Sequence, residues 1–198
     1  MFKIFGSFRI MNMCDQIGDY KQKLKDQIKW AYGNIVYAYT CHRKMADRYQ
    51  KRHKLWQFVQ IILSVIVSGS ITSTLFYDAY YCKLISSSFA ILLAIINLYL
   101  KKYTLVEDAE KHQKSANELW KIREEYVSLL IDLSSLDTTE IVTKRNDLQN
   151  RVYEIYKSSL KTDYKSYKEA RKALKKEEEQ TFDEKEIDIM LPYSLRKN

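Results

Sequence analysis

The sequence predicts an all-α integral membrane protein, in which a two-helix transmembrane hairpin is joined to cytoplasmic helices of coiled-coil type. Residues 55–77 and 84–100 contain no charged side chain. As helices these two runs would span roughly 35 and 26 Å, close to the roughly 30 Å hydrocarbon core of a bilayer. The chain has only four Gly and one Pro, so the residues that mark turns and sheet connections are nearly absent.

Basic side chains flank both apolar runs on the same side of the predicted hairpin. The connecting loop holds only Asp78 and Lys83 as charged residues. Because positive charge accumulates on the cytoplasmic side, both long ends are expected in the cytoplasm, with aromatic residues at both interfaces. The expected interface bases are Lys51, Arg52, Lys54, Lys101 and Lys102.

A buried hairpin in a soluble protein is the alternative, but it would need a large apolar shell, and the rest of the chain is charged and helix-periodic. The second run is short for a span. Either Lys83 extends outward to the headgroups, or the helix continues through residues 79–82.

The positive charge of the chain is concentrated before the membrane. Residues 1–54 hold 12 Lys and Arg against 4 Asp and Glu, whereas residues 101–198 hold 20 of each. A basic segment beside a membrane usually sets topology and attracts anionic lipid. A nucleic-acid surface is the alternative, but no recognisable nucleic-acid module accompanies the charge, so direct binding of nucleic acid is not expected.

The sequence contains no arrangement typical of catalysis or metal binding. The three cysteines lack metal-type spacing, the three histidines are far apart, and no glycine-rich phosphate loop is present. We therefore expect no enzyme activity, no catalytic residue, no metal site and no cofactor. The cysteines are Cys14, Cys41 and Cys82, and the histidines are His42, His53 and His112.

Helical periodicity continues on both sides of the hairpin. Residues 15–54 are predicted as a helix that runs into the first span, with Gly33 and Thr40 as points where it bends or divides. The second span is predicted to continue unbroken into a heptad seam, in which the two polar members set the register or, alternatively, bind a ligand. The seam, a proposed surface for oligomerisation, comprises Leu105, Ala109, His112, Ala116, Leu119, Arg123, Tyr126 and Leu130.

The predicted seam ends at a turn, after which Asp137 and Glu140 have the spacing of a capping box. Heptad spacing in the following helix predicts an antiparallel helical hairpin, and a tyrosine-rich stripe over 153–174 on the same helix is proposed to face another subunit. The expected divisions are residues 1–54, 55–100, 101–175 and a charged tail, 176–198.

Polar side chains recur along one face of the first span, and small or polar residues, Ser86, Ala90, Ala94 and Asn97, lie along one side of the second. One interpretation is close helix packing, and the other is a water-lined pore formed by several subunits. Both interpretations fit the residues equally well. The candidate pore-lining residues are Gln57, Gln60, Ser64, Ser68, Thr72 and Asn97.

The order of these parts resembles the SLATT family of two-transmembrane effector domains from prokaryotic conflict systems. The resemblance covers roughly residues 25–160 and rests on the basic helix 42–53, the two-span hairpin and the helix 107–116. It implies a bacterial inner-membrane effector that oligomerises, forms a pore or disrupts the membrane, and arrests or kills an infected cell.

The family also contains members with a fused sensor or enzyme domain, and this chain shows neither. The resemblance therefore implies a separate trigger from the same anti-phage system: a sensor, a nucleotide-producing enzyme or a reverse transcriptase. Two other functions stay open, namely a non-conducting membrane scaffold that recruits a cytoplasmic partner, and a nucleic-acid-binding membrane protein that uses the basic N-terminal region.

Overall fold

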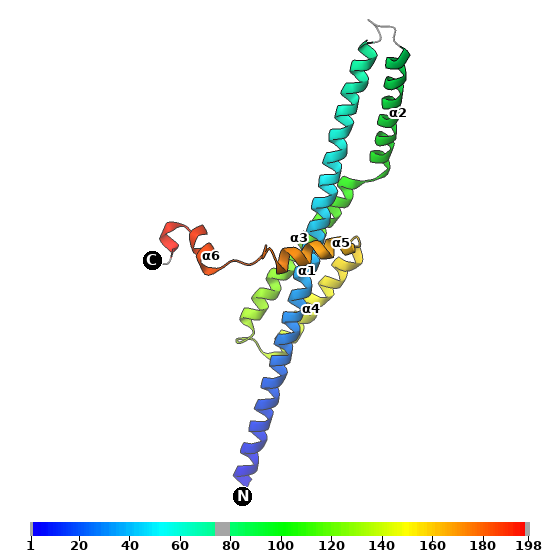
Figure 1. The fold of residues 1–198 in the computed structure, drawn as a ribbon. Helices are drawn as coiled ribbons and strands as arrows, with labels where there is room; N and C mark the ends of the chain where they lie inside the picture. The colour runs from blue at the N-terminus through cyan, green and yellow to red at the C-terminus, as the bar shows by residue number, and fades with distance from the viewer. Residues whose placement is uncertain (1, 74–79, 197–198) are drawn as a thin grey trace.

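The computed structural model describes the backbone of residues 2–73 and 80–196, and the side chains of residues 18–72, 80–81 and 83–196. Within these ranges the chain is helical and contains no strand, which confirms the all-α prediction. Figure 1 shows an elongated molecule in which α1 runs through both halves, a hairpin with α2 and a bundle with the later helices.

Helix α1 (Phe2–Ser73) has 72 residues, which corresponds to about 108 Å. It does not divide at either predicted weak point. At Thr40 the hydroxyl donates to the Val36 carbonyl at 2.8 Å, an arrangement that leaves the helical backbone intact. At Gly33 nothing lies within 4 Å of an added Cβ, so this glycine marks no close approach by another element.

Helix α2 (Tyr80–Lys102) pairs with the second half of α1. It begins before residue 84, so the second span is extended through residues 80–82. In the most apolar stretches of the two long helical segments, only 6% and 11% of the residues are buried within the chain. A soluble protein's core helix would be mostly buried, so this exposed apolar surface suits lipid. The predicted outer-edge residues Phe76, Tyr77 and Asp78 lie outside the described residues.

The second span does not continue unbroken, contrary to our prediction. Helix α2 ends at Lys102 and α3 (Leu105–Asp132) begins after a break at Tyr103 and Thr104. Ile96 is buried on α2 and Leu105 on α3. Nine helical steps of about 100° would place these two side chains about 180° apart on one continuous helix. The break rotates α3 about its axis relative to α2, so that the buried sides of both helices face α1.

Helix α4 (Thr138–Ser158) returns antiparallel to α3, as predicted. Asp137 caps it by accepting from the Thr139 amide, and Glu140 reaches back to the Asp137 amide, which confirms the capping box. The Glu125 carboxylate on α3 accepts from both terminal nitrogens of Arg151 on α4, at 2.5 and 2.6 Å. This bidentate pair fixes the hairpin geometry.

The tyrosine-rich stripe is not on one helix, which corrects a second prediction. The chain leaves the helical path at Ser159, and α5 (Tyr164–Lys175) starts with Asp163 as its N-cap. Figure 1 shows α5 lying across α1. Beyond it, α6 (Glu184–Met190) and the 3-10 helix η1 (Tyr193–Leu195) extend away from the bundle.

One apolar core lies between α1, α3 and α4, in the half of the molecule away from the hairpin. Its members are Leu24, Ile28, Ile35, Leu119, Ile122, Tyr126, Leu129, Leu133, Ile141, Leu148 and Ile155. Leu24, Ile28 and Ile35 form the face of α1 that packs into this core.

Candidate functional site

The predicted pore-lining residues differ in their place on the hairpin, and two of the six lie beside the α1–α2 contact. Leu63 is buried between the helices, and its neighbours Gln60 and Ser64 are half-buried. The remaining candidates are exposed on the hairpin, and they are Gln57, Ser68 and Thr72 on α1 and Asn97 on α2.

The hydroxyls of this stripe bind to their own helix. Ser64 donates to the Gln60 carbonyl at 2.8 Å, Ser68 to the Ser64 carbonyl at 2.8 Å, and Thr72 to the Ser68 carbonyl at 2.9 Å. Such bonds reduce the cost of placing hydroxyls in lipid. They leave Ser68 and Thr72 on the surface of a single chain, where either water or another helix would contact them.

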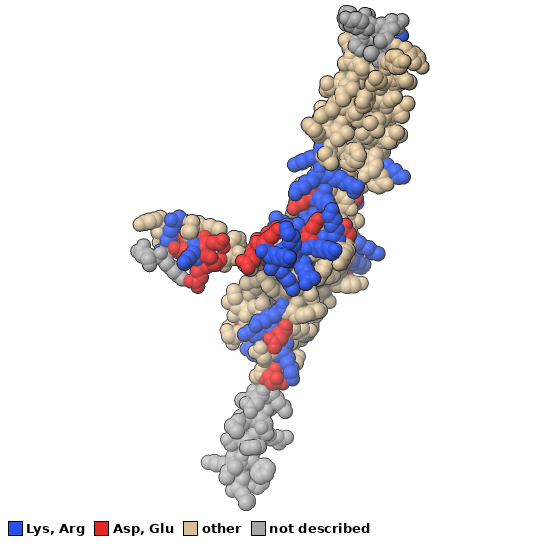
Figure 2. All heavy atoms as spheres, in the orientation of Figure 1, with Lys and Arg blue, Asp and Glu red and all other residues tan. Residues whose placement is uncertain are grey.

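Basic side chains gather at the end of the hairpin that meets the bundle. Figure 2 shows Lys and Arg gathered where the largely uncharged hairpin meets the bundle. Aromatic rings lie at the same level, with Trp56 and Tyr99 5.4 Å apart and Tyr99 and Tyr103 4.5 Å apart between ring centroids. The five predicted interface bases, Lys51, Arg52, Lys54, Lys101 and Lys102, lie at this level as exposed residues.

The predicted oligomerisation seam lies inside the chain. Leu105, Ala109, His112, Ala116, Leu119 and Tyr126 are buried, whereas Arg123 and Leu130 are half-buried. Helix α3 makes its most extensive contact with α1. Helix α1 of the same chain covers these residues of α3. A contact between subunits through them would therefore require α3 to separate from α1.

Two buried histidines join α1 and α3 next to the membrane end of the bundle. The Nδ1 atoms of His42 and His112 are 2.9 Å apart, and the Tyr49 ring stacks on His112 with 5.7 Å between centroids. At this separation one ring donates its Nδ1–H to the unprotonated Nδ1 of the other. The pair therefore holds the two helices together only while at least one ring is neutral.

The electrostatics of the pair favour two neutral rings. Burial, and secondarily the charge of His112, lower the pKa of His42 from 6.5 to about 4. Burial also lowers the pKa of His112, against the opposing influence of Asp108. Both shifts have the sign expected for cations removed from water beside one another.

An ion-pair group fixes α5 to α1 beside the histidines. Nη2 of Arg48 lies 2.8 and 2.7 Å from the two carboxylate oxygens of Asp163, and its Nη1 lies 3.7 Å from Glu169. The backbone amide of Ser166 also donates to Asp163, at 2.7 Å. Arg48 lowers the pKa of Asp163 although burial opposes the shift. Asp163 therefore caps the N-terminus of α5 and is the counterion of Arg48 on α1.

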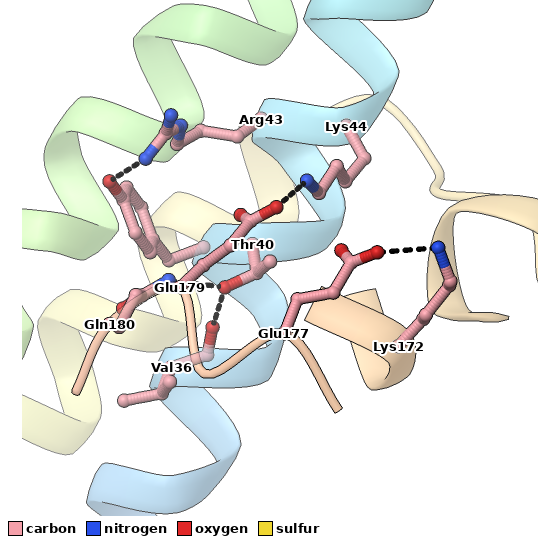
Figure 3. A network of polar contacts seen from close by, with 9 residues as sticks. Val36, Thr40, Arg43, Lys44, Lys172, Glu177, Glu179 and Gln180 are labelled. Atoms are coloured by element: carbon pink, nitrogen blue, oxygen red, sulfur yellow. Dashed lines mark hydrogen bonds and ion pairs between the residues drawn. The ribbon is translucent and has the colours of Figure 1, made fainter. Parts of the chain in front are cut away.

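The segment after α5 crosses back over the bundle, as Figure 3 shows. Gln180 donates to the Thr40 hydroxyl at 2.8 Å and accepts from Arg123 on α3 at 2.7 Å. Glu179 pairs with Lys44 at 2.6 Å. The first residues of the predicted charged tail thus tie α1 to α3.

No group of three or more His, Cys, Asp or Glu residues within the described part of the chain is arranged to hold a metal ion. Cys41 lies beside His42, but burial raises the pKa of its thiol to about 11. At neutral pH this cysteine is a protonated, inert thiol.

The sequence offered one signal for the histidine pair that we did not use. Ile28, Ile35 and His42 are spaced by seven residues on α1, and His112 occupies a seam position on α3. Two histidines at core positions of pairing helices indicate an internal contact. The bonds from Arg48 to Asp163 and from Gln180 to Thr40 had no comparable signal, because in each the two partners are more than 100 residues apart.

Comparison with known proteins identifies the family. No curated protein and no solved structure matches the chain. A family model, described as the SMODS and SLOG-associating 2TM effector domain family 4, matches residues 24–186. This range includes both apolar helices, the histidine pair and the segment tied down by Gln180. The chain therefore belongs to this SLATT family and is a membrane effector domain of conflict systems.

Proposed function

We propose that the protein acts as an oligomeric pore in the bacterial inner membrane, as the effector of an anti-phage defence system and without enzyme activity. The observation that supports this is the exposed polar surface of the hairpin. Ser68 and Thr72 on α1 and Asn97 on α2 are exposed polar side chains on a hairpin surface that is mostly apolar. Polar groups in a membrane usually face other helices or water, and assembly around a pore would provide both.

Helix α1 supplies a physical connection between trigger and membrane. It carries Leu24 and Ile28 in the bundle core and Leu63 in the hairpin contact without a break. A change in the bundle can therefore be transmitted to the hairpin as a movement of one rigid element. The proposed trigger acts on the bundle and comes from a separate sensor, a nucleotide-producing enzyme or a reverse transcriptase of the same system.

Leakage from liposomes tests the pore. The test variant is Ser68→Leu with Thr72→Leu, both exposed, because Leu at the half-buried Ser64 would overfill the α1–α2 contact. If the face lines water, dye release should fall to that of protein-free liposomes while insertion and oligomer size stay unchanged. The matched control, Ser88→Leu on an exposed position of α2, should leak like the parent protein. Unchanged leakage from the double variant would exclude this face from the pore.

The same preparation distinguishes the alternative functions. A membrane scaffold would assemble and bind its partner without releasing dye under any trigger. A nucleic-acid-binding protein that uses the basic region 21–54 would bind RNA or DNA with an affinity that falls steeply with salt.

Orientation is tested separately. We expect both termini in the cytoplasm because the bases at 51–54 and 101–102 flank the hairpin on one side. A reporter enzyme that is active only in the cytoplasm should be active when fused after Asn198. Activity of a periplasm-specific reporter at the same position would reverse the proposed topology.

A further inference from the structure

A basic pocket lies where α5 crosses α1, just below the hairpin. Its volume is about 340 Å³, within the range of small-ligand sites. Figure 2 shows Lys and Arg side chains crowded over this crossing, with acidic residues beside them. The cations that line the pocket are Lys44, Arg48 and Lys51 from α1 and Lys165 and Lys172 from α5.

Three acidic residues, Asp47, Glu169 and Glu177, line the same pocket as these five cations. Outside the lining, Glu179 pairs with Lys44 and Asp163 with Arg48. Glu177 pairs with Lys172, and Glu169 lies 3.7 Å from Arg48. Among the described residues, no carboxylate lies within 4 Å of the Lys51 or Lys165 ammonium, whereas Lys44, Arg48 and Lys172 each have one. Two lysines from different helices therefore line one cavity without a direct ion pair, although the Asp47 carboxylate lies on the same cavity.

Arg48 adds an unused donor to the same cavity. Its Nη2 binds Asp163, whereas Nη1 is buried and has no hydrogen-bond partner within the described part of the chain. A buried donor without an acceptor is unfavourable. A ligand with several anionic oxygens could accept from Arg48, Lys51 and Lys165 together, and a phosphate group has this geometry.

The depth of the pocket agrees with a phosphate at the membrane surface. Lys51 precedes Leu55, where the uncharged run begins, by four residues, or about 6 Å along the helix. The polar headgroup layer of each leaflet is about 5–8 Å thick. Lys51 thus lies at headgroup level, and the other cations lie on the side of the bundle.

We propose that this α1–α5 pocket binds a phosphate monoester or pyrophosphate group, carried either by a lipid headgroup or by a soluble phosphorylated molecule. The bound group bridges α5 to α1 through Lys165 and Lys51. The proposal requires that the hairpin enters the membrane, and it does not require that the protein conducts. Binding and dye release can therefore fail independently.

The test uses the full chain in dodecyl maltoside micelles and measures binding by calorimetry. One arm titrates sodium pyrophosphate, and the other titrates phosphatidic acid. The pocket variant is Lys51→Gln with Lys165→Gln. The matched control is Lys29→Gln with Lys175→Gln, which removes one exposed lysine from each of the same two helices outside the pocket.

We expect the pocket variant to bind about tenfold more weakly, since two charged hydrogen bonds are lost at a partly exposed site. The control should stay within about twofold of the parent. Binding of pyrophosphate alone identifies a soluble ligand, and binding of phosphatidic acid alone identifies a lipid, and each result supports the proposal. Absence of binding in both arms, or an equal loss in both variants, overturns it. Circular dichroism of both variants confirms that neither result reflects unfolding.

Discussion

The hairpin and the bundle share α1 but are stabilised in different ways. In the hairpin, most apolar side chains are exposed, and the hydroxyls of Ser64, Ser68 and Thr72 bind their own helix. In the bundle, apolar side chains are buried and polar groups pair across helices, as in His42–His112. Lipid accepts an exposed apolar surface and water does not, so only the bundle requires a packed core.

This difference indicates where each half gains its specificity. Each hairpin helix satisfies its own backbone, so its arrangement depends on a narrow contact at Leu63 and Ile96. The bundle is defined by many contacts that are distant in sequence. We therefore expect changes in the bundle to affect folding, and changes on the hairpin surface to affect assembly or conduction.

The largest expected effect is a cavity in the bundle core. Leu119 is fully buried at 0% exposure, so Leu119→Ala should cost about 3 kcal/mol of unfolding free energy. The matched hairpin change, Ile95→Ala, removes a side chain that is 57% exposed and should cost less than about 1 kcal/mol. Hydrogen exchange of α3 and α4 in micelles measures both. An equal loss of protection would show that hairpin and bundle unfold as one unit.

The acid sensitivity of the bundle should come next in size. The folded-state pKa of His42 is about 4, below its ordinary value of 6.5. Protonation therefore favours the unfolded state, and the stabilisation is complete above pH 6.5 and lost as the pH falls toward 4. Between pH 6.5 and 4.5 the bundle should lose on the order of 2 kcal/mol.

A substitution isolates this contribution. His42→Gln keeps a side chain that can bond to His112 but does not titrate, so the loss between pH 6.5 and 4.5 should become smaller. His53→Gln, at the membrane edge and outside the pair, is the control and should keep the parent's pH dependence. Chemical unfolding at the two pH values measures the difference. A parent-like pH dependence in His42→Gln would assign the acid sensitivity to other groups.

The parts of this architecture that the sequence predicted are those that depend on local patterns. The spans, the capping box at Asp137 and Glu140 and the heptad spacing of α3 and α4 each depend on residues close together in sequence. The helix break at Thr104 was missed because its cause is a tertiary contact. The buried sides of α2 and α3 can both face α1 only if the helix is interrupted between them. The end of α4 was missed because Asp163, which starts α5, is bound by Arg48, 115 residues earlier in the chain.

The candidate site was predicted less completely for the same reason. A heptad seam identifies an apolar face but does not say what covers it, and here α1 of the same chain covers Leu119 and Tyr126. Ser68 and Thr72 are exposed on the hairpin, and their predicted role as pore-lining residues stays a prediction, because contact with water or protein depends on other subunits.

The smallest expected effect concerns the attachment of α5, where one side chain has two separable roles. Asp163 caps α5 through the Ser166 amide and pairs with Arg48 on α1. Asp163→Asn keeps the cap and weakens the ion pair, so it should cost about 0.5 kcal/mol, because the Asp163 side chain is half exposed. Asp163→Ala removes both roles and should cost about 1.5 kcal/mol. Limited proteolysis near residues 159–163 measures how firmly α5 is held. Equal susceptibility of the two variants would mean that the ion pair, and not the cap, attaches α5 to α1.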